Sequence, residues 1–194
     1  METTALPASQ PTRPRTLVVG SVLATAAATT GFLGLIAIYL QRRAATLSAG
    51  DEWFPEGSIQ LGPAGMVLIT LVLSAVTAQW AVQAVRNDDR PHGYLALGLT
   101  MLFGAAVLNQ FWFVYQDVGF TVDGGEAQLL FYVVTGAFVV LLVVAMLFVA
   151  LTALRALAGQ LSSRHVDGVQ AAAVYWHTVV VLYGIVWYAI FVTK

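Results

Sequence analysis

The sequence predicts an all-α fold, a polytopic transmembrane bundle of about five helices with its N-terminus inside the cell and its C-terminus outside (N-in/C-out). Hydrophobic residues make up 59% of the 194 residues and charged residues only 10%, whereas a soluble domain carries roughly 25% charge. Five long apolar runs hold no Lys, Arg, Asp or Glu in their interiors. A membrane-spanning strand needs only ~9–11 residues that alternate between apolar and polar, so these uniform runs favour helices.

The first 15 residues precede the apolar runs and hold three of the six prolines, together with Ser, Thr and Gln. This composition is typical of a disordered segment, and we interpret 1–15 as a cytoplasmic tail. Residues 16–194 then form one transmembrane domain, and each of its spans has about the ~20 residues that are needed to cross a ~30 Å hydrocarbon core. The predicted spans are 16–40, 62–85, 93–115, 127–153 and 169–192.

Charged residues end the spans and set the predicted orientation. Arg42 and Arg43 end the first span, Arg86 ends the second and Asp117 the third. Cytoplasmic connections of membrane proteins carry an excess of Lys and Arg. With the N-terminus inside, six of the nine basic residues lie inside and three outside. The connection 117–126 has three acids and no base, which fits the outside, whereas Arg42 and Arg43 go against the rule.

Charge and residue types exclude several classes of function. The formal net charge is −1 and the basic residues form no patch, so no nucleic-acid partner is expected. The chain has no cysteine, and of its three histidines only His177 lies at membrane depth, which leaves no ligand set for haem, copper or zinc. The spans also lack the charged groups that are typical of proton paths. We therefore expect no catalytic residue, no metal and no bound cofactor on this chain.

Polar side chains inside the spans are the candidate functional residues, above all Gln79, Asn109, Gln110 and His177. The amides of Asn109 and Gln110 can bond to neighbouring helices, which is worth ~0.6–2 kcal/mol per contact, or can line a ligand or pore site. His177 can satisfy one hydrogen bond between helices, or can serve proton movement or a lipid headgroup. The sequence leaves these alternatives open.

Small residues recur in the first span. They are Gly20, Ala24 and Ala28 at four-residue spacing, with Ala27, Gly31 and Gly34 nearby. Because small residues let helix backbones approach closely, we interpret this stripe as a contact inside the bundle, with a docking face for another subunit as the alternative. Aromatic residues near the ends of the spans, such as Trp53 and Trp112, are interpreted as interfacial belts.

The motif Tyr175-Trp176-His177 in the fifth span resembles the start of the last helix of subunit III of haem–copper oxidases, in its short five-helix bacterial form. Other similarities follow in the same order along nearly the whole chain after the tail. They are Gly34 to Tyr39 in the first span, Trp53-Phe54-Pro55 in the next connection, Ser74, Thr77 and Gln79 in the second span, Gln110 in the third, and Phe131-Tyr132 with Thr135-Gly136 in the fourth. Their order and spacing together carry the resemblance.

The chain departs from this family at most of the family's polar positions within the membrane. The positions that align with two Glu, two His and one Asp of the family are here Ala28, Phe113, Phe138, Leu141 and Val180. His177 is the survivor of that set. The phospholipid binding and the support of proton uptake that the resemblance implies for those positions therefore do not carry over to them.

The resemblance implies a non-catalytic subunit that packs against the catalytic subunit I of a respiratory terminal oxidase, which holds the haem and copper. It also implies enclosed structural phospholipids, support of proton uptake, and a multi-pass location in the plasma membrane of a bacterium. Two alternatives remain: the subunit III-like accessory protein of nitric oxide reductase, and a small channel or carrier for neutral solutes. The candidate interhelical or lipid-contacting residues are Trp176, His177, Tyr175, Gln110, Asn109 and Gln79.

Overall fold

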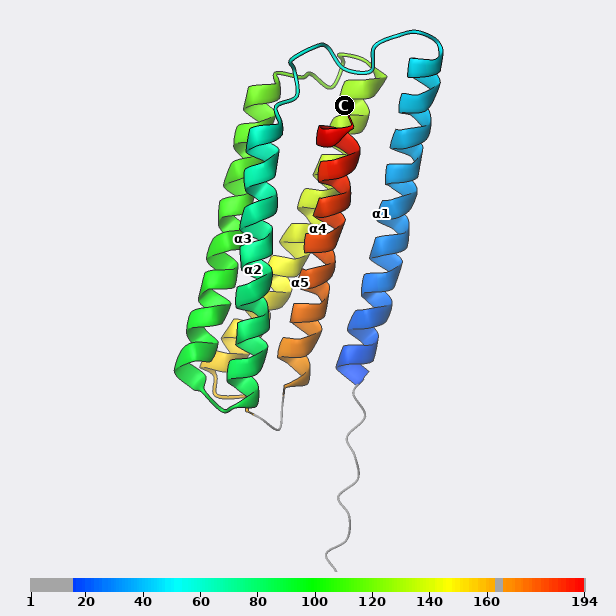
Figure 1. The fold of residues 1–194 in the computed structure, drawn as a ribbon. Helices are drawn as coiled ribbons and strands as arrows, with labels where there is room; N and C mark the ends of the chain where they lie inside the picture. Colours follow the sequence, from blue (N-terminus) through cyan, green and yellow to red (C-terminus); the bar gives the residue numbers. More distant parts are fainter. Residues whose placement is uncertain (1–15, 163–165, 194) are drawn as a thin grey trace, which may run out of the picture.

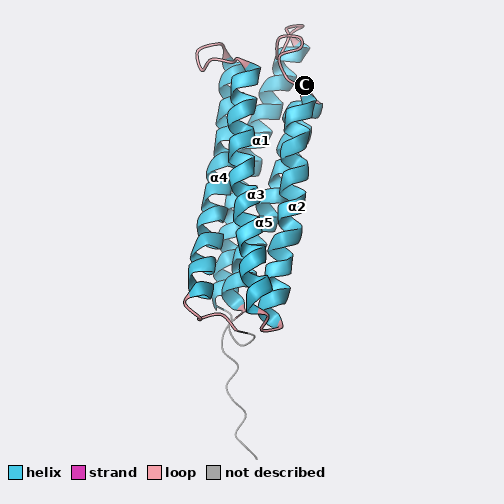
Figure 2. Cartoon of the chain, turned by 90° about the vertical axis from the view of Figure 1, so that its left-hand side faces the viewer, coloured by secondary structure: helices cyan, strands magenta, loops and turns pink. Residues whose placement is uncertain are grey.

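The computed structural model describes residues 16–162 and 166–193, so the tail predicted at 1–15 lies outside the described residues. All five predicted spans are helices and the described residues contain no strand, so the all-α prediction is confirmed. The helices are α1 (Thr16–Ser48), α2 (Leu61–Arg86), α3 (Arg90–Val118), α4 (Glu126–Leu157) and α5 (Asp167–Val186), and α5 continues as a π-helix, η1, over Trp187–Val192 (Figures 1 and 2).

Each helix reaches beyond its predicted span, at one end or at both. Helix α1 continues past Arg42 and Arg43 and has 33 residues, a length of about 50 Å at 1.5 Å per residue. A charge ends the part of a helix that lies in hydrocarbon, but the backbone hydrogen bonds continue into the headgroup region. Helix α3 is instead ended by local caps. At α3, the Asp89 side chain accepts from the His92 N–H at the start, and Gly119 takes the left-handed conformation at the end.

Helix α5 lies at the centre of the bundle. It packs against α1, α2 and α4, while α2 and α3 form the most extensive pair. Figure 1 shows α5 between α1 and that pair. In the apolar part of Asp167–Val192, 56% of the residues are buried, against 22% to 33% in the other four helices. The side chains of α5 therefore join α1, α2 and α4, while α3 is held by α2 and α4.

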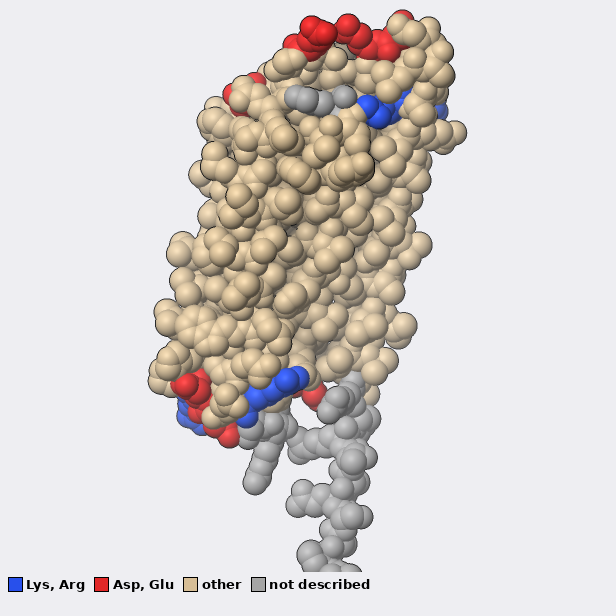
Figure 3. All heavy atoms as spheres, in the orientation of Figure 1, with Lys and Arg blue, Asp and Glu red and all other residues tan. Residues whose placement is uncertain are grey.

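The charged residues gather at the two ends of the bundle, and the middle of the face in Figure 3 carries none. Arg86 and Arg90 lie at the end where α1 begins, and Arg42 and Arg43 lie at the other end. Which end faces the cytoplasm stays a prediction. Arg42 forms an ion pair with Glu126 of α4, with 3.3 Å between Nε and Oε1. One of the two bases that go against the orientation rule is thus matched by an acid.

An aromatic cluster closes the end of the bundle at which α1 ends. Trp53 follows α1 and donates from Nε1 to the Tyr39 hydroxyl at 3.0 Å. Phe54 stacks on Phe120, with their ring centroids 5.4 Å apart. Trp53 is only 6% exposed, so its interpretation as part of an interfacial belt is wrong. Its indole N–H finds a partner inside the bundle rather than in the headgroup region.

The small-residue stripe of α1 does not face the bundle. Gly20, Gly31 and Gly34 are exposed, and a Cβ on any of them would meet no atom within 4 Å. The prediction of a contact inside this chain is therefore wrong. Another face of α1 makes the contact, with Ser21, Thr25, Phe32, Ile36 and Tyr39 buried. Ser21 Oγ donates to the Ala171 carbonyl of α5 at 2.9 Å and satisfies both groups away from water.

Candidate functional site

Trp176 joins α5 to the helices around it. Its side chain is fully buried, and its Nε1 donates to Ser74 Oγ of α2 at 2.9 Å. A Cβ on Gly104 of α3 would lie 3.0 Å from the Trp176 ring and 3.1 Å from Met146 of α4. Trp176 is thus bonded to α2 at the level where α3 and α4 also meet, and the missing side chain at position 104 makes room for its ring.

Hydroxyl groups continue from Trp176 toward α3. Ser74 Oγ donates to the Leu71 carbonyl at 2.6 Å, and Thr77 Oγ1 donates to the Ser74 carbonyl at 2.9 Å. The hydroxyl oxygens of Thr77 and Thr100 lie 2.9 Å apart, within hydrogen-bond distance. Ser74 and Thr100 are fully buried. Since hydrocarbon offers no hydrogen bonds, these groups must be satisfied within the protein, and here each of them is.

The neighbours of Trp176 along α5 also make structural contacts. Tyr175 is buried and stacks on Phe148 of α4, with centroids 5.6 Å apart. Tyr183 donates from its hydroxyl to the Ala64 carbonyl of α2 at 2.9 Å. Phe138, where the resemblance expects a histidine, is fully buried and packs 5.0 Å from the Tyr183 ring. An aromatic core thus occupies this family position.

His177 follows Trp176 but lies about 100° further round the helix. It lines an open groove between α1, α2 and α5. Its Nδ1 bonds to the Ala173 carbonyl of its own helix and not to another helix. Because a carbonyl only accepts, Nδ1 carries a proton in this contact, and Nε2 is the ring nitrogen that the contact leaves unused. Nε2 is therefore the atom that His177 can offer to a ligand in the groove.

The groove has a volume of about 530 Å³, which is within the usual range of ligand sites. Gln79 and Arg86 line it from α2, and Gln170 and His177 line it from α5. Each pair is seven residues apart, which is two helical turns or about 10 Å, so the groove has two polar levels. Among the described residues, its lining holds one cation and no acid. The remaining lining residues are Val18, Val82, Ala173, Val174 and Thr178.

Of the four polar residues of the groove, Gln79 and His177 were predicted as candidates from the sequence, whereas Arg86 and Gln170 were not. The shared seven-residue spacing on two different helices is the signal that could have found them, since it places each pair on one helix face.

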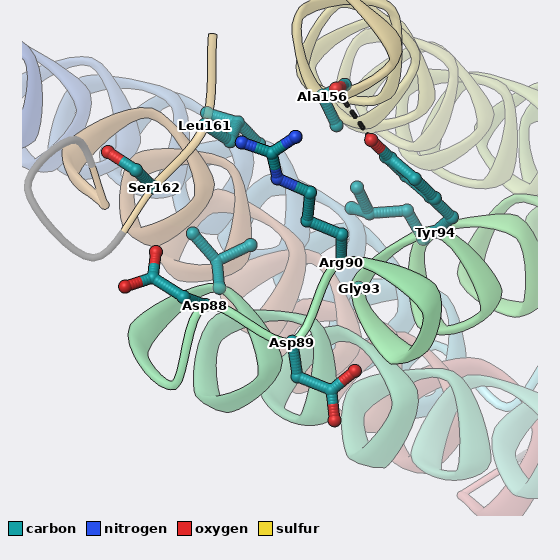
Figure 4. Close-up of a pocket in the computed structure, with 10 residues that line it drawn as sticks. Asp88, Asp89, Arg90, Gly93, Tyr94, Ala156, Leu161 and Ser162 are labelled. Atoms are coloured by element: carbon teal, nitrogen blue, oxygen red, sulfur yellow. Dashed lines mark hydrogen bonds between the residues drawn. The ribbon is translucent and has the colours of Figure 1, made fainter. Parts of the chain in front are cut away.

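A second hollow lies beside the turn between α2 and α3. Asp88, Asp89 and Arg90 surround it (Figure 4), and Tyr94 donates to the Ala156 carbonyl of α4 at 3.1 Å. Its volume of about 20 Å³ has room for roughly one water molecule. Two larger hollows, of about 410 and 370 Å³, lie among the connections at the opposite end. The groove at His177 is therefore the candidate site between the helices.

The two adjacent amides of α3 have different surroundings. Gln110 donates from Nε2 to Thr70 Oγ1 of α2 at 3.0 Å, and its buried Oε1 has no partner among the described residues. Asn109 is exposed on the outside of the bundle, and its side chain makes no hydrogen bond within the described chain. The structure brings Gln110 but not Asn109 into the bundle, and neither residue lines the groove.

The ionisable groups of the described residues form no reactive cluster. No group of three or more His, Cys, Asp or Glu that could hold a metal ion occurs among them. Hydrogen bonds from the ring and the N–H of His92 lower the pKa of Asp89, but this exposed pair caps α3.

These features define a multi-pass helical membrane protein whose central helix is fixed by buried hydrogen bonds and borders a polar groove. The family model of cytochrome c oxidase subunit III matches residues 1–193. The chain belongs to the cytochrome c oxidase subunit III family.

Individual relatives agree with this assignment. The chain is 31% identical to cytochrome c oxidase subunit 3 of Salmo salar over 166 residues, 84% of this chain and 62% of the relative. Identity is 31% with the protein of Sus scrofa, with the same coverage of both chains, and 32% with that of Gadus morhua, over 78% of this chain and 60% of the relative. The chain thus spans about six tenths of the length of these relatives.

Proposed function

We propose that this chain is a non-catalytic subunit of a haem–copper terminal oxidase. In this proposal the chain holds a phospholipid in its groove between α1, α2 and α5. The groove carries the proposal, because it reaches Arg86 at the end of α2 and its lining among residues 16–162 and 166–193 includes no acid. Family membership supports the place in an oxidase, since the relatives are named as subunits of cytochrome c oxidase. Haem and copper then belong to the catalytic subunit I as partner.

A glycerophospholipid fits the groove by charge and by polarity. Arg86, at the end of α2, offers charge-assisted hydrogen bonds to a phosphate, and Gln170, in the first turn of α5, lies at the same end. About 10 Å deeper, the Gln79 amide donates to an ester carbonyl and His177 Nε2 accepts from a hydroxyl or a water molecule. The three valines of the lining provide an apolar path for one acyl chain.

The lipid also has a structural role in this proposal. Helix α1 packs mainly against α5 and α4, whereas α2 packs mainly against α3 and α5. A lipid between α1 and α2 fills the gap that these two helices leave and fixes α1. In the plasma membrane of a bacterium, which is the location we propose, this rigid bundle stabilises the catalytic subunit and supports its proton uptake.

Purification of the oxidase with and without this chain tests its role. We expect an unchanged haem absorbance spectrum without it, since the haem sites lie in the partner, and a shorter active lifetime during turnover. Loss of haem from the purified complex would contradict the proposal.

The lipid site is tested by Arg86→Gln, with Arg155→Gln as the matched control because Arg155 lies at the same end outside the groove. A charge-assisted hydrogen bond is worth about 1.5–3 kcal/mol, so lipid affinity falls at least about tenfold. Native mass spectrometry of the full complex in mild detergent measures the lipid that each variant retains. Equal retention by the two variants would exclude this groove as the lipid site.

A further inference from the structure

One face of α3 points away from the bundle along its whole length. The residues of this α3 outer face are all exposed and follow one another at alternating steps of three and four: Leu95, Gly98, Leu102, Ala105, Asn109, Trp112 and Gln116. Steps of three and four residues place all of these residues on one side of the helix. They therefore form one continuous exposed face, and the side chains on it decide what it can contact.

The α3 outer face combines small residues with large ones. A Cβ on Gly98 would meet no atom within 4 Å, and Ala105 is one heptad further along. Small residues at this spacing let the backbone of a second transmembrane helix approach closely. Leu102 and Trp112 are 63% and 66% exposed, so the face offers large side chains to pack beside that helix.

Asn109 gives this face its specific chemistry. It lies nine residues before Val118, or about 14 Å from the end of α3, and its exposed side chain makes no hydrogen bond within the described chain. An amide without a partner in hydrocarbon is costly. The next residue, Gln110, meets this requirement by its bond to Thr70. Asn109 must meet it from outside the chain.

We propose that the α3 outer face docks a transmembrane helix of a different polypeptide, which carries a hydrogen-bonding side chain at the depth of Asn109. The identification of that polypeptide as an oxidase subunit rests on the proposed function. The docking itself rests on the exposed Asn109 amide and on the small residues beside it on this face.

Charge favours a different polypeptide over a second copy of this chain. Asp117 follows Gln116 at the end of the face, and the connection that begins there also holds Asp123, while its third acid, Glu126, forms the ion pair with Arg42. A second copy in the same membrane orientation would bring two such acidic segments together. The partner that fits therefore carries Lys or Arg at this end of its helix, where it meets Asp117 in the headgroup region.

Site-specific photo-cross-linking in native membranes tests the proposal. The photoreactive residue p-benzoylphenylalanine is introduced into the full chain at Leu102 or, as a control of matched exposure, at Val140 of α4, where the exposed fractions are 63% and 61%. We expect a protein adduct from position 102 and only lipid adducts from position 140. Lipid adducts alone from position 102, or a dimer of this 20.7 kDa chain, would overturn the proposal.

The partner's identity separates this inference from the proposed function. An adduct with a haem-containing oxidase subunit supports both. An adduct with an unrelated membrane protein supports the docking face and contradicts the oxidase role.

Substitutions at Asn109 test its hydrogen bond. Asn109→Leu reduces partner retention in mild detergent about threefold, as expected for one interhelical hydrogen bond, and Asn109→Gln restores part of it. Equal retention of the partner by the natural chain, Asn109→Leu and Asn109→Gln would show that the amide has no part in docking.

Discussion

Trp176 and His177 are neighbours on α5, but they serve opposite surroundings. Trp176 is fully buried and bonded to α2 through Ser74, at a level where α3 and α4 also meet. His177 is half-buried, bonds to its own helix and borders the groove beside Gln79. The comparison shows that one turn of a central helix can stabilise the bundle by packing and a hydrogen bond on one side, and can present a polar surface to a ligand on the other.

The adjacent amides of α3 repeat this division. Gln110 ties α3 to Thr70 inside the bundle, whereas Asn109 faces outward. In both pairs, the inward residue has its main hydrogen bond within the chain, and the outward residue keeps a polar atom available. Substitutions on the inward side should therefore change stability, and those on the outward side should change what the chain binds.

The largest effect is expected for Trp176→Ala. Truncation of a fully buried tryptophan costs about 3–5 kcal/mol, and we expect the lower end because apolar surface gains little by leaving lipid. His177→Ala is the matched substitution on the groove side, and its cost should stay below about 1 kcal/mol. The free energy of unfolding, measured by SDS titration in mild detergent, compares the two. Similar losses for both variants would remove the distinction between the two sides of α5.

Gly104→Val tests the same side of α5 by adding volume. A Cβ at position 104 already comes within 3.0 Å of the Trp176 ring and 3.1 Å of Met146, and overpacking costs typically about 1–3 kcal/mol. Gly31→Val is the control, because no atom lies within 4 Å of a Cβ at that position. SDS titration should show a lower free energy of unfolding for the first variant alone. No difference between the variants would mean that this junction is loosely packed.

The number of helices could be predicted from the sequence, whereas the direction in which single side chains point could not. Five uncharged runs near twenty residues long have few alternatives in a bilayer, and the structure contains these helices. Which face of a helix is covered depends on neighbours that are distant in sequence. For that reason Tyr175-Trp176-His177 looks like a single motif in the sequence, although His177 faces the groove and Trp176 the core. Asn109 and Gln110 likewise look like one pair, although only Gln110 points into the bundle.

The groove could be predicted only in part for the same reason. Gln79 and His177 are conspicuous because they are polar and lie inside apolar runs. Arg86 and Gln170 lie at helix ends, where polar residues are ordinary, so composition gives no reason to select them. Their place in the groove follows from the packing of α2 and α1 on α5, which no local pattern specifies.

An effect similar in size to that of Gly104→Val is expected for Ser74→Ala, which isolates one hydrogen bond of the Trp176 junction. The substitution leaves the indole N–H without its acceptor, at a cost of about 1–3 kcal/mol for a buried group. In a Trp176→Phe background the same substitution should cost less, since phenylalanine has no N–H to satisfy. A double-mutant cycle of unfolding free energies measures this coupling. A coupling of zero would show that packing alone holds the indole.

The smallest effect is expected at the exposed end of the bundle, where the Asp89–His92 contact resembles a buried hydrogen bond in geometry but not in surroundings. The His92 ring lies 2.7 Å from a carboxylate oxygen of Asp89, and hydrogen bonds from His92 lower the pKa of Asp89. A carboxylate whose pKa is lower in the folded state stabilises the fold above its unfolded pKa, near 3.9. That contribution disappears as the pH falls through the lowered pKa of the folded state.

Melting temperatures in detergent compare Asp89→Asn with the natural chain. The natural chain should melt at a slightly higher temperature at pH 6, and the difference should shrink at pH 3. An advantage of the natural chain that grows toward pH 3 would mean that the ionised Asp89 destabilises the fold. The exposed end would then differ from the Trp176 junction in the sign of its contribution to stability as well as in its magnitude.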